Sequence, residues 1–348
     1  MLGPPLLPRN LGASVRDLSS TRPDVRASAI SDLVRHAQNE EVVREHAIAL
    51  LTQRLTDDHP QVRAAGAVAL GDLKATESVG SLLAVMDDED AHVRQMAIHA
   101  LGEIGDARSL PRLRRALEDA RPEVRYQSII AFSRVADVDG LDASEVDDAL
   151  FAAANDDDAA ISHIALRVAE ERLDKGRAPD GRLLARARAL LANGAVLAPD
   201  VVLVAAILLA KAGDARGHEV VARVVRGEKI NGQAPNKEDE RAAVELAGEL
   251  GLVKLVGELE RRAWGVARFV RDTCSFHARI ALARMGHDRA KKEILGELGS
   301  TRREVLAGAV VSAGRARMVE ARAAISRLTA GAVDPDLTSE ALARLDAG

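Results

Sequence analysis

Acidic and basic side chains recur at a fixed spacing in the first part of the sequence. An aspartate precedes an arginine by six residues three times, at Asp57 and Arg63, Asp88 and Arg94, and Asp119 and Arg125. Such a set could be a row of acids and bases for catalysis, or a set of charged hydrogen bonds that hold the fold together. A carboxylate near a helix N-terminus is stabilised by the free N–H groups and the helix dipole there, which favours the structural interpretation.

The arginines belong to a longer repeated pattern that predicts helices. A Val-Arg pair occurs at 25/26, 62/63, 93/94 and 124/125, in steps of 37, 31 and 31 residues. After each pair, apolar residues follow at helical spacing, as in Val93, Ala97, Leu101 and Ile104, and form one face that a helix can bury. Gly105 then ends the helix, because glycine takes a left-handed conformation at little cost. Each repeat is therefore expected to be a helical hairpin of about 31 residues whose second helix begins near its Val-Arg pair.

The composition favours an all-α chain. Alanine occurs 64 times in 348 residues, whereas Phe, Tyr and Trp together number six, and β-sheets favour aromatic and β-branched residues. We therefore expect helices that pack closely through small side chains. Turn-like signals recur at Gly213-Asp214-Ala215-Arg216, Gly251, Gly286-His287-Asp288-Arg289 and Gly314-Arg315-Ala316-Arg317. Because single hairpins cannot bury both apolar faces, these signals predict a right-handed α-solenoid of roughly nine to ten stacked helical hairpins.

The repeated residues resemble the HEAT repeat. The pattern D-x-x-P-x-V-R-x-x-A-x-x-A-L-G-x-x-G-D is similar to the bacterial variety first noted in phycobilisome lyase subunits. The resemblance is strong over about residues 20–136, so we divide the chain into regular repeats at 1–136 and divergent repeats of the same solenoid at 137–348. It implies that the aspartates and arginines form a ladder from repeat to repeat. Ser20 replaces the first aspartate and Ser162 the arginine after Asp156, so the ladder should weaken near the fifth repeat.

The sequence offers little that predicts catalysis. It contains no phosphate-binding loop, dinucleotide-binding glycine motif, nucleophile elbow, zinc-binding H-E-x-x-H or EF-hand loop. HEAT enzymes that bind iron use several His-Glu pairs, and this chain has one such dipeptide, His218-Glu219. A bilin-lyase-like subunit is an alternative, although six aromatic residues are few for a tetrapyrrole pocket. We expect no enzymatic activity, no catalytic residue, no metal and no cofactor.

The expected location is the cytoplasm. The single cysteine, Cys274, excludes an intrachain disulfide framework and favours a reducing compartment. The first residues, MLGPPLLPRNLG, lack a charged region before an uninterrupted apolar core, and no stretch of 18 apolar residues predicts a membrane span.

Charge is distributed unevenly along the chain. Residues 137–158 contain nine acidic and no basic residues, whereas 261–292 contain nine Lys or Arg against two aspartates. The net charge is −9 over residues 1–200 and +4 over 201–348. Solvated helix faces and an acidic loop would explain this asymmetry, and so would a docking patch or contacts between copies. The basic stretch also leaves nucleic-acid binding as an alternative function.

The favoured function is a scaffold or adaptor that binds another protein along the concave surface, which the second helices usually line in HEAT arrays. Positions six residues after each repeat valine should form a row there, through Val68, His99, Ile130 and Arg167. The full set of candidate contacts has an amino-terminal group and a carboxy-terminal group, although each residue could instead be partly buried between hairpins. They are His99, Tyr126, Ile130, His163 and Arg167, and Trp264, Arg268, Phe269, Arg271 and Phe276.

Residues 227–238 are expected to form an exposed loop inside a late repeat. Gly227, Gly232 and Pro235 interrupt helical continuity, and few apolar residues are present to anchor the segment.

Overall fold

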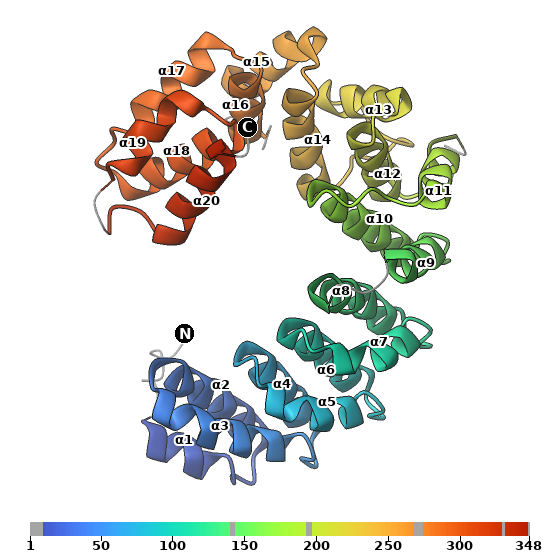
Figure 1. Cartoon of the computed structure of the whole chain (residues 1–348), viewed down its shortest axis with the longest axis vertical. Coiled ribbons are helices and arrows are strands. Elements are labelled where there is room, and N and C mark those ends of the chain that lie inside the picture. Colours follow the sequence, from blue (N-terminus) through green and yellow to red (C-terminus); the bar gives the residue numbers. More distant parts are fainter. Residues whose placement is uncertain (1–9, 140–142, 193–196, 267–273, 329–330, 347–348) are drawn as a thin grey trace. The chain divides into compact units, whose positions relative to one another are not determined.

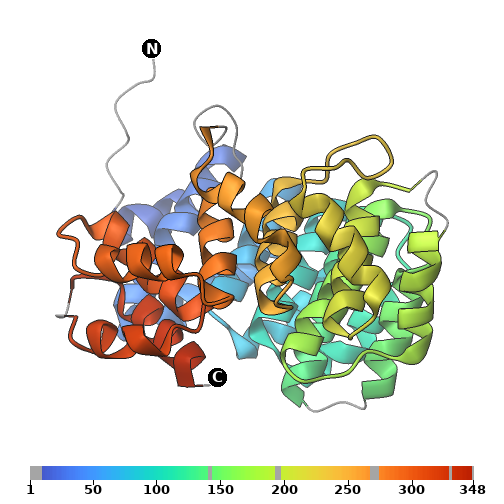
Figure 2. The ribbon, with the colours of Figure 1, turned by 90° about the horizontal axis from the view of Figure 1, so that it is seen from above.

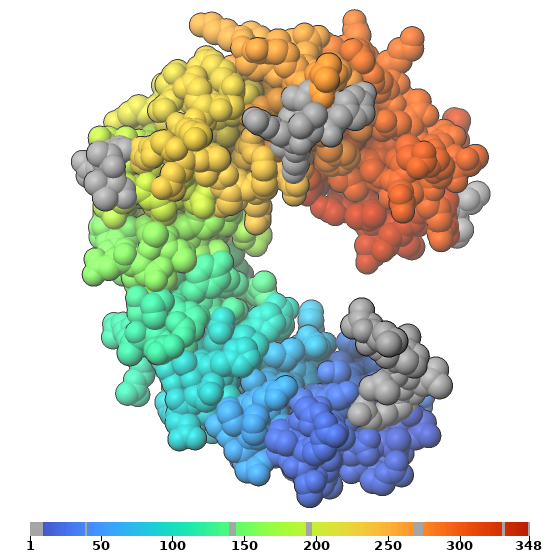
Figure 3. Space-filling model, turned by 180° about the vertical axis from the view of Figure 1, so that it is seen from behind, coloured from blue at the N-terminus to red at the C-terminus, as the bar shows by residue number. Residues whose placement is uncertain are grey.

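The structure, a computed structural model, describes residues 10–139, 143–192, 197–266, 274–328 and 331–346. These ranges contain twenty α-helices, no β-strand and one isolated backbone pairing, between Ile230 and Gln233. The helices cluster into two compact units, Met1–Ala169 (unit 1) and Glu170–Gly348 (unit 2), shown in Figure 1. Within each unit, successive repeats follow one another as adjoining bands of colour (Figure 3). The predicted all-α solenoid of helical repeats is confirmed.

Each repeat contains a first, odd-numbered helix and a second, even-numbered helix. The first helices are α1 Leu11–Asp17, α3 Glu41–Arg54, α5 Val79–Val85, α7 Leu110–Ala116, α9 Ala143–Ala153, α11 Gly181–Ala192, α13 Ala215–Val225, α15 Val256–Trp264, α17 Asp288–Glu297 and α19 Arg322–Ser326. The second helices are α2 Pro23–Asn39, α4 Pro60–Asp72, α6 Ala91–Ile104, α8 Pro122–Asp139, α10 Ala159–Asp174, α12 Pro199–Lys211, α14 Lys237–Glu249, α16 Ser275–Arg284, α18 Arg303–Arg315 and α20 Pro335–Asp346. Short 3-10 turns precede four of the first helices, at η1 Thr76–Ser78, η2 Ala107–Ser109, η3 Val253–Leu255 and η5 Val319–Ala321.

The regular second helices begin where the Val-Arg pairs predict. Each starts two residues before its valine, at Pro23, Pro60, Ala91 and Pro122. Proline fits the first helical turn because its missing N–H has no intrahelical partner there. Where proline is absent, at α6, the side chain of Asp90 caps the helix by accepting the backbone N–H of His92 at 2.8 Å.

The second helices of successive repeats stack on one another, α2 to α8 in unit 1 and α12 to α20 in unit 2. Glycine opposite alanine allows this close approach. A Cβ added at Gly102 would lie 2.9 Å from the Cβ of Ala131, closer than ordinary van der Waals contact. The same arrangement places Gly71 against Ala100, Gly248 against Ala281 and Gly314 against Ala341. Small residues, of which alanine is abundant in the sequence, therefore lie at the helix–helix contacts.

The turn predicted at 314–317 lies at the end of this range, after the last of these glycines. Gly314 lies inside α18, which continues to Arg315, and the left-handed residue that follows is Arg317, with φ of 51°. In the regular repeat, Gly102 makes the helix contact and Gly105, three residues later, takes the left-handed conformation with φ of 75°. The repeat at 314–317 has glycine at the contact position, Gly314, and arginine at the left-handed position, Arg317.

The core of unit 2 surrounds a helix that is buried on all sides. Every residue of α12 from Val201 to Ala210 is buried. A helix that is apolar all round is expected in a protein core or in a membrane. In the part of the chain that the structure describes, no helix is both long enough and apolar enough to cross a bilayer.

The connection from α13 to α14 is more structured than predicted. Helix α14 begins at Lys237, so the loop ends at Asn236. The loop is largely exposed, but Ile230 is 3% exposed and anchors it in the core of unit 2. Asn231 and Gly232, with φ of 50° and 78°, form the two-residue turn between the paired Ile230 and Gln233. Figure 2 shows the whole connection as a yellow loop that projects beyond the helices of unit 2. The predicted exposed loop is therefore confirmed over residues 227–236, and Ile230 is the buried residue that anchors it.

The glycine contacts make a direct prediction about stability. Gly102→Ala should lower the free energy of unfolding by about 1–3 kcal/mol, because the new methyl group overpacks the contact with Ala131. Gly80 is also helical, but nothing lies within 4 Å of a Cβ added there. Gly80→Ala should therefore leave stability unchanged or raise it by up to about 1 kcal/mol through helix propensity. Urea unfolding followed by circular dichroism measures both, and equal midpoints for the two variants would contradict the role of glycine in stacking.

Candidate functional site

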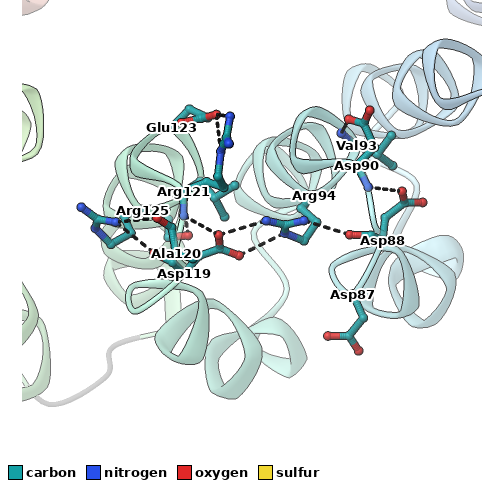
Figure 4. Close-up of polar contacts among 12 residues, drawn as sticks. Asp87, Asp88, Asp90, Val93, Arg94, Asp119, Ala120, Arg121, Glu123 and Arg125 are labelled. Carbon is teal, nitrogen blue, oxygen red and sulfur yellow. Dashed lines mark hydrogen bonds and ion pairs between the residues drawn. The ribbon is translucent and has the colours of Figure 1, made fainter.

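Arg94 connects two repeats of unit 1 (Figure 4). From α6, its Nε and Nη2 atoms donate to the two carboxylate oxygens of Asp119, both at 3.0 Å. Its Nη1 atom donates to the backbone carbonyl of Asp88 at 3.0 Å. Asp88 lies in the turn of the same repeat as Arg94, and Asp119 lies in the equivalent turn of the next repeat. One guanidinium group therefore forms hydrogen bonds with the turn of its own repeat and with the equivalent turn of the next repeat.

The same contact occurs four times in unit 1. The other pairs, measured from Nε to the nearest carboxylate oxygen, are Arg26 and Asp57 at 2.9 Å, Arg63 and Asp88 at 2.7 Å, and Arg125 and Asp156 at 2.9 Å. Ser20 replaces aspartate at the start without loss of the turn contact, because Arg26 uses the backbone carbonyl of residue 20, at 2.9 Å. The series ends at Asp156, since Ser162 stands where the next arginine would be and its hydroxyl donates to the carbonyl of Ala154.

The carboxylates of these pairs are held in their charged form. Asp119 accepts the backbone N–H of Arg121 at 2.9 Å in addition to the guanidinium of Arg94. Burial raises the pKa of Asp119, but the hydrogen bonds from Arg94 and from the backbone outweigh it and lower the pKa below its usual value. The pKa values of the equivalent carboxylates are lowered in the same way, at Asp57, Asp88 and Asp156. Charged, hydrogen-bonded carboxylates of this kind suit a structural role better than proton transfer.

The second helices of unit 1 carry the amino-terminal candidate contacts. Val68, His99 and Ile130 are half-buried at equivalent positions of α4, α6 and α8. Val68 and His99 each precede by three residues a glycine that contacts the next second helix. His99 is 3.4 Å from the side-chain amide nitrogen of Gln127, so it already has a neighbour on α8. Tyr126 on α8 and His163 and Arg167 on α10 are also half-buried. The candidates therefore share a surface made by successive second helices.

A groove of about 350 Å³ lies on this surface, nearer the N-terminus than the residues singled out from the sequence. Its floor and walls come from α2, α4 and α6, and no first helix contributes to it. The apolar lining includes Ile30, Val34, Val68 and Met96, and the polar rim includes Gln61, Asp72 and His92. Small residues of α4, Ala64 and Ala65, leave the space that forms it. The signal that sequence reasoning missed was this pair of alanines on one helix, which lies between helices that carry larger residues.

The carboxy-terminal candidates are partly engaged by the chain itself. Trp264, the last residue of α15, is half-buried, and its indole N–H donates to Glu293 at 2.9 Å. The guanidinium carbon of Arg289 lies 4.0 Å from the centre of the indole ring. Phe276 on α16 is half-buried and packs against the core of unit 2. Arg268, Phe269 and Arg271 lie outside the described residues.

The basic stretch 261–292 is neutralised to a large extent inside unit 2. Arg262 illustrates this, because its Nη1 lies 2.8 Å from Glu240 and its remaining N–H groups donate to the carbonyls of Val224 and Val225. Glutamates also pair with Arg261, Arg279, Arg289 and Lys291. Five of the nine basic residues of the stretch are therefore in ion pairs.

Charge divides between the two units. Met1–Ala169 contains 28 acidic and 18 basic residues, and Glu170–Gly348 contains 25 acidic and 30 basic residues. Part of the acidic run at 137–158 is paired, since Arg114 binds Glu145 and Arg125 binds Asp156. Among the residues that the structure describes, no three His, Cys, Asp or Glu side chains are grouped as metal ligands.

Comparison with protein-family models gives a match within the regular repeats. Residues 48–133 match the sequence profile of HEAT repeats, which confirms the resemblance over a range that includes Arg63, Arg94 and Arg125. No curated protein matches the sequence.

Solved structures resemble the chain in fold. The Escherichia coli protein YibA matches with a TM-score of 0.52 and 17% identity, over 80% of this chain and 93% of YibA. A homology model of the full-length AP-3 complex in an intermediate open conformation matches with a TM-score of 0.53 and 12% identity, over 95% of this chain and 67% of the other. The CpcE and CpcF complex of phycocyanin lyase from Nostoc sp. matches with a TM-score of 0.43 and 17% identity, over 74% and 94%. At these sequence identities, the similarity to YibA and to the AP-3 model shows the solenoid fold and nothing more. The TM-score of the CpcE and CpcF complex is too low to support an argument.

The Arg-Asp contacts predict a large effect of one substitution and its dependence on pH. At pH 7, Arg94→Ala should lower the free energy of unfolding by about 1–3 kcal/mol, because it removes the guanidinium that donates to the partly buried Asp119 and to the carbonyl of Asp88. An aspartate whose pKa is lowered by folding stabilises the folded state at pH values above its unfolded-state pKa of about 3.9. This stabilisation is lost as the pH falls through the lower, folded-state pKa. The difference between wild type and Arg94→Ala should therefore shrink in acid, as urea unfolding at a series of pH values would show.

Arg35 provides the matched control. Its side chain is 43% exposed and its partner, Asp32, lies three residues away on the same helix at 3.0 Å. Arg35→Ala should change the stability by less than about 0.5 kcal/mol. If Arg35→Ala and Arg94→Ala have the same urea midpoints, the contact between repeats does not stabilise the array.

Proposed function

We propose that this protein is a non-enzymatic scaffold or adaptor that binds another protein along the surface of its second helices. The observation that carries the proposal is the groove of about 350 Å³ on α2, α4 and α6. HEAT repeats at 48–133 support it, because repeat arrays of this kind present extended surfaces for partners.

The lining of the groove suits an apolar anchor from a partner. Val68 and Met96 are half-buried, so each leaves apolar surface that a partner can cover. Ile30 and Val34 are buried beneath them and supply a rigid floor. The exposed edge of the groove is polar and consists of Gln61, Asp72 and His92. Polar groups at the rim of an interface can fix the orientation of the bound partner. An apolar side chain of a partner helix or extended segment would occupy the groove, with polar contacts around it.

Two further features of the proposal follow from the sequence. The chain would act without metal or cofactor, through contact alone. It would act in the cytoplasm, a location that suits the single buried thiol of Cys274.

Protein binding is favoured over nucleic-acid binding by the pairing of the basic stretch. A nucleic-acid site needs cations that are free to neutralise phosphates. Arg262 and Arg279 are instead held by Glu240 and Glu297, at 2.8 and 2.7 Å. The protein should therefore cause no salt-dependent retardation of duplex DNA or of RNA in native gels, and retardation that weakens with added salt would favour the alternative function.

The groove is tested by a charge placed inside it. Immobilised wild-type protein should retain a partner from the native cell extract, and Val68→Glu should lose at least nine-tenths of it, because a carboxylate cannot be desolvated against an apolar anchor. Mass spectrometry would identify the retained protein.

Val42→Glu is the matched control, since Val42 lies on the first helix α3 and is 94% exposed. It should retain the partner fully, and all three proteins should have the same melting temperature within a few degrees. If wild type, Val68→Glu and Val42→Glu retain the same proteins in the same amounts, the groove is not the binding surface.

A further inference from the structure

The groove of unit 1 follows the whole length of one helix. Residues of α4 line it at spacings of four, three and four positions, so they share one face of that helix. They are Gln61, Ala65, Val68 and Asp72. Gln61 is the second residue of α4 and Asp72 is the last. Because a helix rises about 1.5 Å per residue, the groove is about 16 Å long, which is about three helical turns.

The backbone around the groove favours a helical occupant over an extended one. All of the lining residues lie within α2, α4 and α6, where backbone N–H and carbonyl groups bond to one another along the helices. Even at the start of α4, the N–H of Gln61 donates to the ring of His59 at 3.3 Å. At the start of α6, the N–H of His92 donates to Asp90 at 2.8 Å. An extended peptide needs a strand edge to pair its backbone groups, whereas a helix pairs its own.

Asp72 places an unbalanced negative charge at one end of the groove. Its side chain is exposed and forms no ion pair with any residue that the structure describes. The other acidic residues of α2, α4 and α6 are paired with arginines within the chain, Asp24 with Arg22, Asp32 with Arg35 and Glu103 with Arg134. Lys74, the nearest basic residue along the chain, is exposed but is not among the residues that line the groove. Asp72 is therefore available to a cation of the occupant.

The charge of unit 1 as a whole also favours a basic occupant. The unit contains 28 acidic and 18 basic residues. A net negative charge attracts cationic segments and orients them before contact. The middle of the groove is apolar, through Val68 and Met96, so the cation belongs at the end that Asp72 forms.

We propose that the groove holds a basic amphipathic helix of the partner, an inference that rests on the function proposed above. The apolar stripe of this helix covers Val68 and Met96, and a lysine or arginine at the end of the stripe pairs with Asp72. Asp72 follows Val68 by four residues, which is about 6 Å along α4. The cation of the partner therefore lies three or four positions from an apolar anchor on its own helix.

Three synthetic peptides test the inference on the full chain by fluorescence anisotropy. The basic probe is the blocked, dye-labelled peptide AQLAQLLQALKQAK, in which leucines form one helical face and each lysine follows a leucine by four positions. The neutral probe has glutamine, and the acidic probe glutamate, in place of both lysines. The basic probe should bind with a dissociation constant on the order of 10–100 µM, about threefold tighter than the neutral probe and about tenfold tighter than the acidic probe. Salt at about 0.5 M should reduce these differences, because it screens exposed ion pairs.

Variants of Asp72 separate the ion pair from the apolar contact. Asp72→Asn should weaken binding of the basic probe about threefold and leave the neutral probe unchanged. Asp72→Lys should reverse the preference, so that the acidic probe binds more tightly than the basic probe. Glu77→Gln is the matched control, because it removes one exposed negative charge from unit 1 outside the groove. It should leave the affinities of all three probes unchanged.

A proline variant of the basic probe tests the helical conformation. Proline in place of the leucine at its seventh position should weaken binding at least about tenfold, because proline interrupts a helix. Equal binding of the two peptides would exclude a helix as the occupant.

Val68→Glu distinguishes failure of this inference from failure of the proposed function. It should weaken binding of all three probes at least about tenfold, because it places a carboxylate in the apolar part of the groove. If the three probes bind equally and Val68→Glu still abolishes binding, the groove is a docking surface and the basic character of its occupant is wrong. A preference for the basic probe that persists in Asp72→Asn would also overturn the inference. If no probe binds at about 1 mM, the basic helix is excluded, and retention from the cell extract decides the proposed function separately.

Discussion

Close stacking of the second helices is the constraint on which the rest of this structure depends. A hairpin of two short helices cannot bury its apolar faces alone and must lie against a neighbour. Gly102 against Ala131 and Gly71 against Ala100 set how near the helices come, because a larger side chain would hold them apart. At that distance Arg94 reaches Asp119 of the next repeat with two hydrogen bonds of 3.0 Å. The charged contacts therefore require the stacking that they reinforce.

The same stacking decides which side chains remain available to partners. Small residues fill the contacts between second helices, so larger side chains at the positions between them, such as Val68 and Ile130, are left half-buried at the surface. On α4, the small residues Ala64 and Ala65 line the groove in this surface. An alanine-rich solenoid of closely packed helices thus also leaves apolar side chains half-buried at its surface.

Unit 2 uses the same architecture with different chemistry. Glycine contacts persist, at Gly248 and Gly314, but the regular Arg-Asp series ends at Asp156. Individual ion pairs replace it, such as that of Arg262 with Glu240, in which both side chains are partly buried. The indole of Trp264 is held by Glu293 and Arg289 in a similar way. Divergent repeats can therefore keep the stacking distance while changing the polar contacts between helices.

The repeat unit could be predicted from the amino-acid sequence. Helix starts at proline, a left-handed residue at Gly105 and apolar spacing after each Val-Arg pair act within a single repeat of about 31 residues, so they can be read locally. Sequence reasoning also selected Arg63, Arg94 and Arg125 as a related set, because their spacing from aspartate is constant.

Which groups meet across repeats depends on the tertiary structure. There, five basic residues of 261–292 pair with glutamates such as Glu240 and Glu297, and three helices form a groove. These contacts are set by short distances in space. Pairing and burial depend on a few ångströms between side chains of different repeats, and no spacing along one repeat contains that information.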